Sequence, residues 1–104
     1  MENVRVGLIT GRHPMPVDEY LINKVDNALL SADRMNDLRK LINTAVNEFS
    51  NNHKVEDGPI DLYLTGLSIV QHIAVQFLSD YGYIVRLFNY DRMADDYYCF
   101  MEII

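Results

Sequence analysis

The sequence has few of the residues that mark secreted, metal-binding or membrane proteins. Its 104 residues include no tryptophan, three prolines and one cysteine, Cys99. A single cysteine cannot form an internal disulfide, which favours a reducing compartment, and the three histidines lack zinc-ligand spacing. No apolar run reaches the roughly 20 residues that a membrane helix needs, and no signal-peptide pattern opens the chain. We therefore expect a cytoplasmic protein with no disulfide, structural metal or membrane span.

Positive charge is also scarce. Nine Lys and Arg residues stand against fifteen Asp and Glu residues, a net charge of −6, which disfavours non-specific binding of DNA or RNA. The acids occur singly or in pairs such as Asp95-Asp96, without the dense rows that would imitate nucleic acid. Nine of the eleven aromatic residues lie at or after Tyr63. The carboxyl-terminal half therefore holds most of the large apolar surface, either for a core or for a partner.

Apolar periodicity and turn residues divide the chain into four strands and three helices. Strands are expected at 4–10, 60–65, 83–89 and 97–104, and helices at 17–30, 32–50 and 68–81. The segment D-R-M-A-D joins the last two strands and is too short for a crossover, so these strands form an antiparallel hairpin. Within it we expect Arg86 to lie across from Glu102, because both charges interrupt apolar runs.

The order β-α-α-β-α-β-β predicts a single small α/β domain over residues 1–104. Its sheet is Rossmann-like, with three parallel strands and an antiparallel carboxyl-terminal edge strand. Whether the third strand flanks the first or the second stays open. In the second helix, apolar residues recur at spacings of 3, 4, 3 and 4 from Met35 to Phe49, as in a coiled-coil seam. We expect a homo-oligomer in which this helix contacts another subunit.

Local patterns also predict the ends of the last helix and the place of the cysteine. Ser68 and Gln71 have the spacing of a capping box, and Gly82 suits the left-handed position that ends a helix. His72, one turn after Ser68, could bond that hydroxyl. Cys99 alternates with its neighbours on the last strand, which favours a core position.

The carboxyl ends of the parallel strands are the expected ligand site, because they meet at one edge of the sheet. Two strands end in Thr-Gly, where glycine allows close backbone approach, and the helix after the second pair offers free N–H groups with no acid in its first turn. Catalytic residues are not predicted, since the chain has no phosphate-binding glycine loop and no nucleophile elbow. No cofactor is expected. The predicted ligand-binding residues are Thr10, Gly11, Arg12, His13, Thr65, Gly66, Ser68, Asn89, Asp91 and Arg92.

Two stretches of the second half carry a resemblance to known proteins. L-Y-L-T-G-L-S-I-V-Q-H-I-A, followed by L-F-N-Y-D-R-M-A-D-D-Y-Y, resembles small α/β proteins of bacteriophages and other mobile elements. The Thr-Gly turns are also similar to those of the CRISPR-associated Rossmann fold, whose domains bind cyclic oligonucleotide messengers. The resemblance covers about Leu62 to Tyr98. It implies a bacterial host cytoplasm and a cyclic-nucleotide signal held by Thr10-Gly11, Thr65-Gly66 and Asp91-Arg92.

Three functions are compatible with these features. The first is a counter-defence protein that binds or sequesters a nucleotide-derived immune signal at the carboxyl edge of the sheet. The second is an inhibitor that docks on a host defence complex through its aromatic carboxyl-terminal half. The third is a small phosphodiesterase, or ring nuclease, built on the same edge. The lack of an obvious catalytic set favours binding over cleavage.

Overall fold

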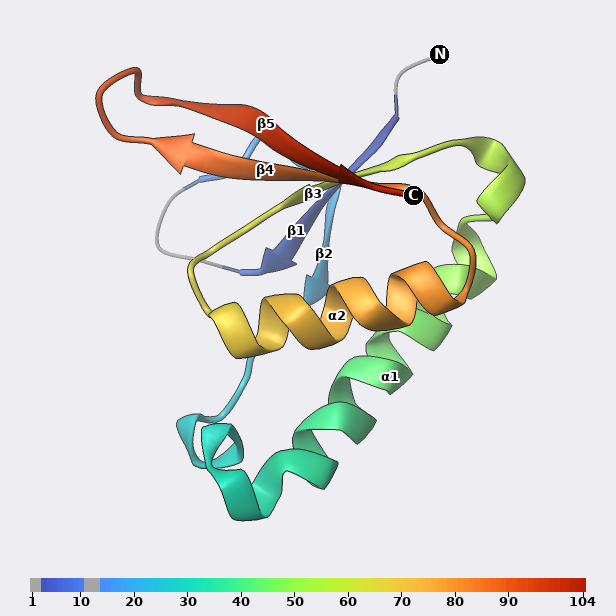
Figure 1. The fold of residues 1–104 in the computed structure, drawn as a ribbon, viewed down its shortest axis with the longest axis vertical. Coiled ribbons are helices and arrows are strands. Elements are labelled where there is room, and N and C mark those ends of the chain that lie inside the picture. Colours follow the sequence, from blue (N-terminus) through green and yellow to red (C-terminus); the bar gives the residue numbers. More distant parts are fainter. Residues whose placement is uncertain (1–2, 11–13) are drawn as a thin grey trace.

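The fold is a five-stranded sheet with two helices on one of its faces (Figure 1). The computed structural model describes residues 3–10 and 14–104. Its strands and helices are β1 (Val4–Ile9), β2 (Glu19–Ile22), α1 (Met35–Asn52), β3 (Ile60–Tyr63), α2 (Ser68–Asp80), β4 (Val85–Asp91) and β5 (Asp96–Ile103). Neither helix in this part of the chain is long and apolar enough to cross a bilayer.

The strand order is β2-β1-β3-β4-β5. β1, β2, β3 and β4 are parallel, and β5 pairs with β4 in the antiparallel direction. This arrangement confirms a small Rossmann-like α/β domain with an antiparallel edge strand at its carboxyl end. It also answers the question left open by the sequence, because β4 flanks β3 rather than β1.

β2 is a fourth parallel strand in a segment expected to be a helix over 17–30, and that expectation is wrong. The Asp18 amide donates to the Arg5 carbonyl at 2.8 Å and the Thr10 amide to the Ile22 carbonyl at 3.2 Å, so the segment follows the length of β1. Pairing with the free edge of β1 overrides the helical spacing of apolar residues in this segment, because strand formation depends on tertiary context. Parallel neighbours usually need a longer crossover than residues 10–18, which is why the pattern misled.

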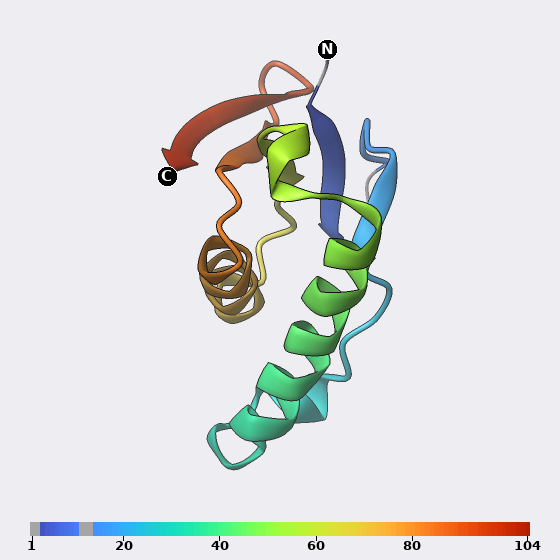
Figure 2. The same ribbon diagram turned by 90° about the vertical axis from the view of Figure 1, so that its right-hand side faces the viewer.

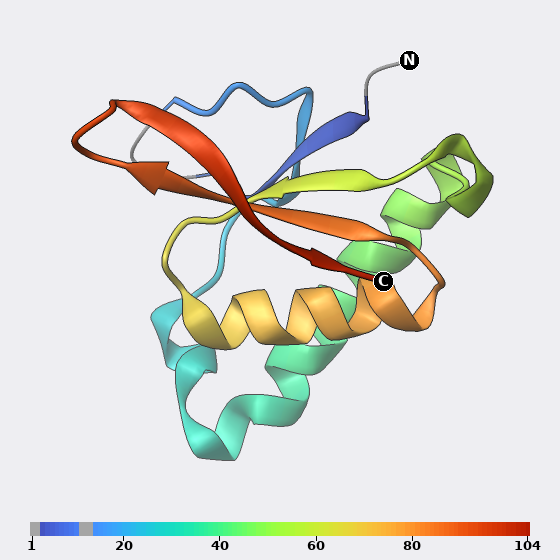
Figure 3. The same ribbon diagram turned by 45° about the horizontal axis from the view of Figure 1, so that its top comes forward.

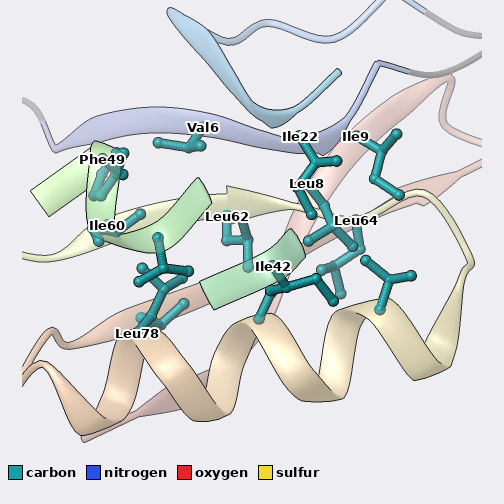
Figure 4. Close-up of a cluster of buried hydrophobic side chains, with 14 of the residues drawn as sticks. Val6, Leu8, Ile9, Ile22, Ile42, Phe49, Ile60, Leu62, Leu64 and Leu78 are labelled. Carbon is teal, nitrogen blue, oxygen red and sulfur yellow. The ribbon is translucent and has the colours of Figure 1, made fainter. Parts of the chain in front are cut away.

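The helical stripe of α1 faces the sheet. Its buried residues are Leu38, Ile42, Val46 and Phe49. They pack into one core cluster with side chains such as Leu8 and Leu62 (Figure 4). The seam-like spacing thus serves the core of the protein itself, and a contact of this helix with another subunit stays a prediction.

The start of α2 differs from the prediction, and its end agrees with the prediction. At its start, Leu67 is the N-cap and no side chain caps the helix, so the expected capping box is absent. His72 Nδ1 instead donates to the Ser68 carbonyl at 2.7 Å. At its end, Gly82 has φ of +97°. The Gly82 and Tyr83 amides donate to carbonyls of the last turn, as in a Schellman motif, which confirms the predicted end.

The β4–β5 hairpin forms as predicted, with different charge pairing. Arg86 and Glu102 are direct cross-strand neighbours. However, Arg86 Nη1 donates to Asp61 Oδ1 at 3.2 Å, on β3. The Asp61 carboxylate is buried, so it has the greater need of a guanidinium partner.

Cys99 is exposed on β5, so the expected core position is wrong. The edge strand β5 has a neighbouring strand on one side only.

Gly7 of β1 provides a test of packing on the face opposite the helices. A Cβ atom at Gly7 would lie 2.6 Å from Cδ1 of Tyr20 and 3.1 Å from Sδ of Met15. We expect Gly7→Ala to displace the Tyr20 ring and to lower the free energy of unfolding by about 1–3 kcal/mol, measured by urea denaturation. In the Tyr20→Ala background the same substitution should cost much less, because the clash is gone. Additive costs in that double-mutant cycle would contradict this packing.

Candidate functional site

A cleft of about 540 Å³ lies at the carboxyl edge of the parallel strands. Figure 1 shows how this edge forms: β3 leads directly into the start of α2, beside the end of β4. The lining residues are Ile9, Thr10, Met15, Leu64, Thr65, Gly66, Leu67, Asn89, Tyr90 and Tyr97. The edge predicted from the two Thr-Gly pairs therefore carries a cleft large enough for a small-molecule ligand.

Four of the predicted site residues line this cleft together: Thr10, Thr65, Gly66 and Asn89. They come from the ends of three neighbouring strands, as the parallel order requires. The predictions for Gly11, Arg12 and His13 fall outside the described residues.

The remaining three predicted residues lie beside the cleft and do not line it. Ser68 is exposed and is the first residue of α2. Asp91 Oδ1 accepts the Met93 amide at 2.9 Å, so its carboxylate holds the hairpin turn. Arg92 is exposed within that turn. Turn chemistry thus accounts for the Asp91 side chain without a ligand.

Gly66 and Leu67 line the cleft and lead into the start of α2, which has free backbone donors. Gly66 has φ of +89°, and no atom lies within 4 Å of the place where a Cβ would sit. The first helical hydrogen bond runs from the Gln71 amide to the Leu67 carbonyl, so the amides of residues 68–70 have no helical acceptor. The first turn holds no acid and no side-chain cap. Such a helix start favours an anion.

The Thr65 hydroxyl is the second polar feature of the cleft. Its Oγ1 is buried and has no hydrogen-bond partner among the described residues. A buried hydroxyl without a partner costs about 1–3 kcal/mol, so a ligand atom that bonds it would recover that cost. Sequence reasoning identified Thr65 by its place before Gly66, and its missing partner depends on long-range packing.

Aromatic rings form one wall of the cleft, which the sequence reasoning did not assign to the site. The rings of Tyr90 and Tyr97 meet edge to face with centroids 5.4 Å apart. Tyr97 in turn meets Tyr63 at 5.0 Å, and Tyr63 stacks on Phe88 at 4.7 Å. These four residues, the aromatic cluster, cover part of the sheet face opposite the helices. Only β-strand register could have predicted their assembly.

The pKa is raised above the ordinary value of 10.0 for three tyrosines of the cluster and for Tyr83, at the other edge of the sheet. Burial is the main cause for Tyr63, Tyr83 and Tyr97. For Tyr90 the main cause is a hydrogen bond that its hydroxyl donates to the Asp95 carboxylate. In each case the neutral phenol is favoured in the folded state.

His53 and Glu19 form a pair at the opposite, amino edge of the sheet, next to a cavity of about 310 Å³. His53 Nε2 lies 3.2 Å from both carboxylate oxygens of Glu19. The Tyr83 hydroxyl donates to the His53 carbonyl, and the imidazole stacks on Phe49 at 4.5 Å. The pair joins β2 to the end of α1, a role that the sequence did not reveal.

The described residues offer neither a metal site nor a basic side chain in the cleft. Within 3–10 and 14–104, no group of three or more His, Cys, Asp and Glu side chains could hold a metal ion.

Comparisons with protein-family models, curated proteins and solved structures found no match. The assignment of the cleft therefore rests on its own chemistry: a helix start, hydroxyl and amide groups, and aromatic rings.

The raised tyrosine pKa values predict a loss of stability in alkali. Above about pH 10 the unfolded chain releases phenolic protons that folded Tyr63, Tyr83 and Tyr97 retain. The contribution of these tyrosines to the free energy of unfolding should be constant below that pH. It should fall as the pH rises toward and through their folded pKa values. Urea denaturation over an alkaline pH series measures this, and Tyr63→Phe should flatten the decline. An unfolding free energy that rises with pH in that range would contradict the assignment.

Proposed function

We propose that this protein binds a small nucleotide-type ligand in the carboxyl-edge cleft and holds it intact. The observation that carries the proposal is the convergence of three features in one cleft: an uncapped helix start, an unpartnered buried hydroxyl and a tyrosine wall. Anionic, hydroxyl-rich and flat aromatic parts occur together in nucleotides. The resemblance to mobile-element proteins extends this proposal to a nucleotide-derived immune signal that the protein sequesters.

Each part of such a ligand has a matching group. A phosphate would accept hydrogen bonds from the amides of residues 68–70 at the start of α2, where the helix dipole adds attraction. A base would pack on Tyr90 and Tyr97, and base–aromatic stacking contributes about 1–3 kcal/mol. The Asn89 amide can donate to and accept from a base edge. Thr65 Oγ1 would bond the sugar or a phosphate oxygen.

Binding without cleavage is supported by the lining residues. The described lining contains no Asp, Glu, His, Lys or Cys side chain. Hydrolysis of a phosphodiester needs a positioned base or a nucleophile activated by one, and threonine hydroxyls alone are weak nucleophiles. The composition of the cleft thus favours sequestration over ring cleavage.

A second function, docking on a host defence protein, is favoured by a different observation. Tyr98, Phe100 and Met101 on β5 are each about half exposed.

Incubation with cyclic mononucleotides, dinucleotides and larger cyclic oligonucleotides separates the candidates. A raised melting temperature with intact ligand supports the proposal, a consumed ligand supports the phosphodiesterase, and no shift with any of them supports the docking function. Ligand at about 100 times its Kd should add about 2.7 kcal/mol of stability.

Ser68→Asp tests the helix start as the anion site. A carboxylate in the first turn should stabilise α2 by about 0.3–1 kcal/mol through the helix dipole. It should also repel a bound phosphate and weaken the ligand at least tenfold in calorimetry. Asn36→Asp makes the same charge change in the first turn of α1, away from the cleft lining, and should leave affinity unchanged. Equal affinity of Ser68→Asp and the parent would show that the anion lies elsewhere.

Thr65→Val tests the unpartnered hydroxyl. The change keeps the side-chain shape and removes a buried group without a partner, so the free protein should keep or gain up to about 1 kcal/mol of stability. Ligand affinity should fall by about fivefold or more, since the bound hydroxyl loses its bond. Thr44→Val, on the exposed side of α1, is the matched control. A variant that loses stability and keeps full affinity would place Thr65 in the fold alone.

A further inference from the structure

A groove of about 370 Å³ lies between α2 and β5, away from the carboxyl-edge cleft. Its lining residues are Gln71, His72, Val75, Gln76, Ser79, Leu87, Phe100, Met101 and Ile103. Figure 2 shows that β5 crosses above α2 and that its end extends past the helix. The helix-side residues of β5 therefore form one wall of the groove, and α2 forms the other.

The register of the hairpin keeps Glu102 away from this groove, and Asp80, whose Oδ1 accepts from Gln76 Nε2 at 3.1 Å, lies beside the lining rather than in it. Met101 and Ile103 lie opposite Leu87 and Val85, which are buried toward the helices. Glu102 alternates to the other face of the sheet. The groove lining accordingly contains no Asp or Glu in a chain whose net charge is −6.

The exposed apolar area of β5 and of Ile104, which follows it, is close to what one half of a stable interface supplies. Tyr98, Phe100, Met101 and Ile104 are 48%, 44%, 49% and 91% exposed. With roughly 200 Å² for a large side chain, these four expose roughly 460 Å². A standard interface buries about 800 Å² on each partner, of which somewhat more than half is apolar.

We propose that a second copy of this chain covers the groove between α2 and β5 and forms a twofold dimer. Two copies of a −6 chain repel each other least where few carboxylates face the contact, and no Asp or Glu side chain lines the groove. A basic partner would gain nothing from it. Side-chain packing rather than strand pairing holds the dimer, because the register shift between Leu87 and Phe88 interrupts β5 at Phe100.

Met101→Lys tests this dimer by light scattering and sedimentation over a concentration series. The parent should be dimeric, and the variant should raise the dimer Kd by about 100-fold or more, since it places two charges in the contact. Gln76→Arg, on the exposed helix wall of the groove, should act in the same direction. Met93→Lys makes the same charge change on the 97% exposed hairpin tip and should leave the dimer intact.

Three results would overturn the proposal. The first is a parent that stays monomeric at the highest concentration reached. The second is a dimer that both groove variants leave unchanged while their melting temperatures match the parent. The third is a dimer that weakens as salt increases, because salt should screen the repulsion between acidic copies and tighten it. Hydrogen exchange adds a positive readout: at high concentration, protection should increase in α2 and β5 and stay constant in α1.

Discussion

The placement of both helices on one face of the sheet is the constraint on which the rest of the structure depends. α1 and α2 bury one side of β1, β3 and β4 in a continuous aliphatic core (Figure 4). The other side must be closed by the strands' own side chains and by residues 14–18 before β2 (Figure 3). The aromatic cluster, the Asp61–Arg86 pair and the Tyr20 ring over Gly7 are three parts of that closure. The cleft wall at Tyr90 and Tyr97 is its continuation.

Elements that depend on local signals were predictable from the sequence. β3, α2 and the hairpin have their own periodicity and end at turn residues such as Gly82, and the structure confirms them. β2 was not predictable, because residues 19–22 become a strand only where β1 offers a free edge. Cys99 was misplaced for a related reason: alternation identifies the face of a strand, and only the sheet order reveals that β5 is an edge.

The residues of the candidate site also differ in whether the sequence could predict them. Thr10, Thr65 and Gly66 could be found because strand direction alone brings the ends of parallel strands together. The unpartnered state of the Thr65 hydroxyl and the tyrosine wall depend on contacts between β3, β4 and β5, which no spacing in the sequence encodes. Asp91 has a pattern that suits both a ligand and a turn, and its Oδ1 accepts the Met93 amide of the turn.

β2 has a consequence for the order in which the native structure opens. It is a four-residue edge strand, paired on one side only, and its link to the rest of the chain includes the exposed contact between Glu19 and His53. Such a strand belongs to the least protected cooperative unit of a domain. Its detachment would free the edge of β1 and remove Ile22 from the core cluster. We therefore expect partial opening to begin at the amino-terminal side of the sheet, because the β4–β5 pairing is longer than the β1–β2 pairing.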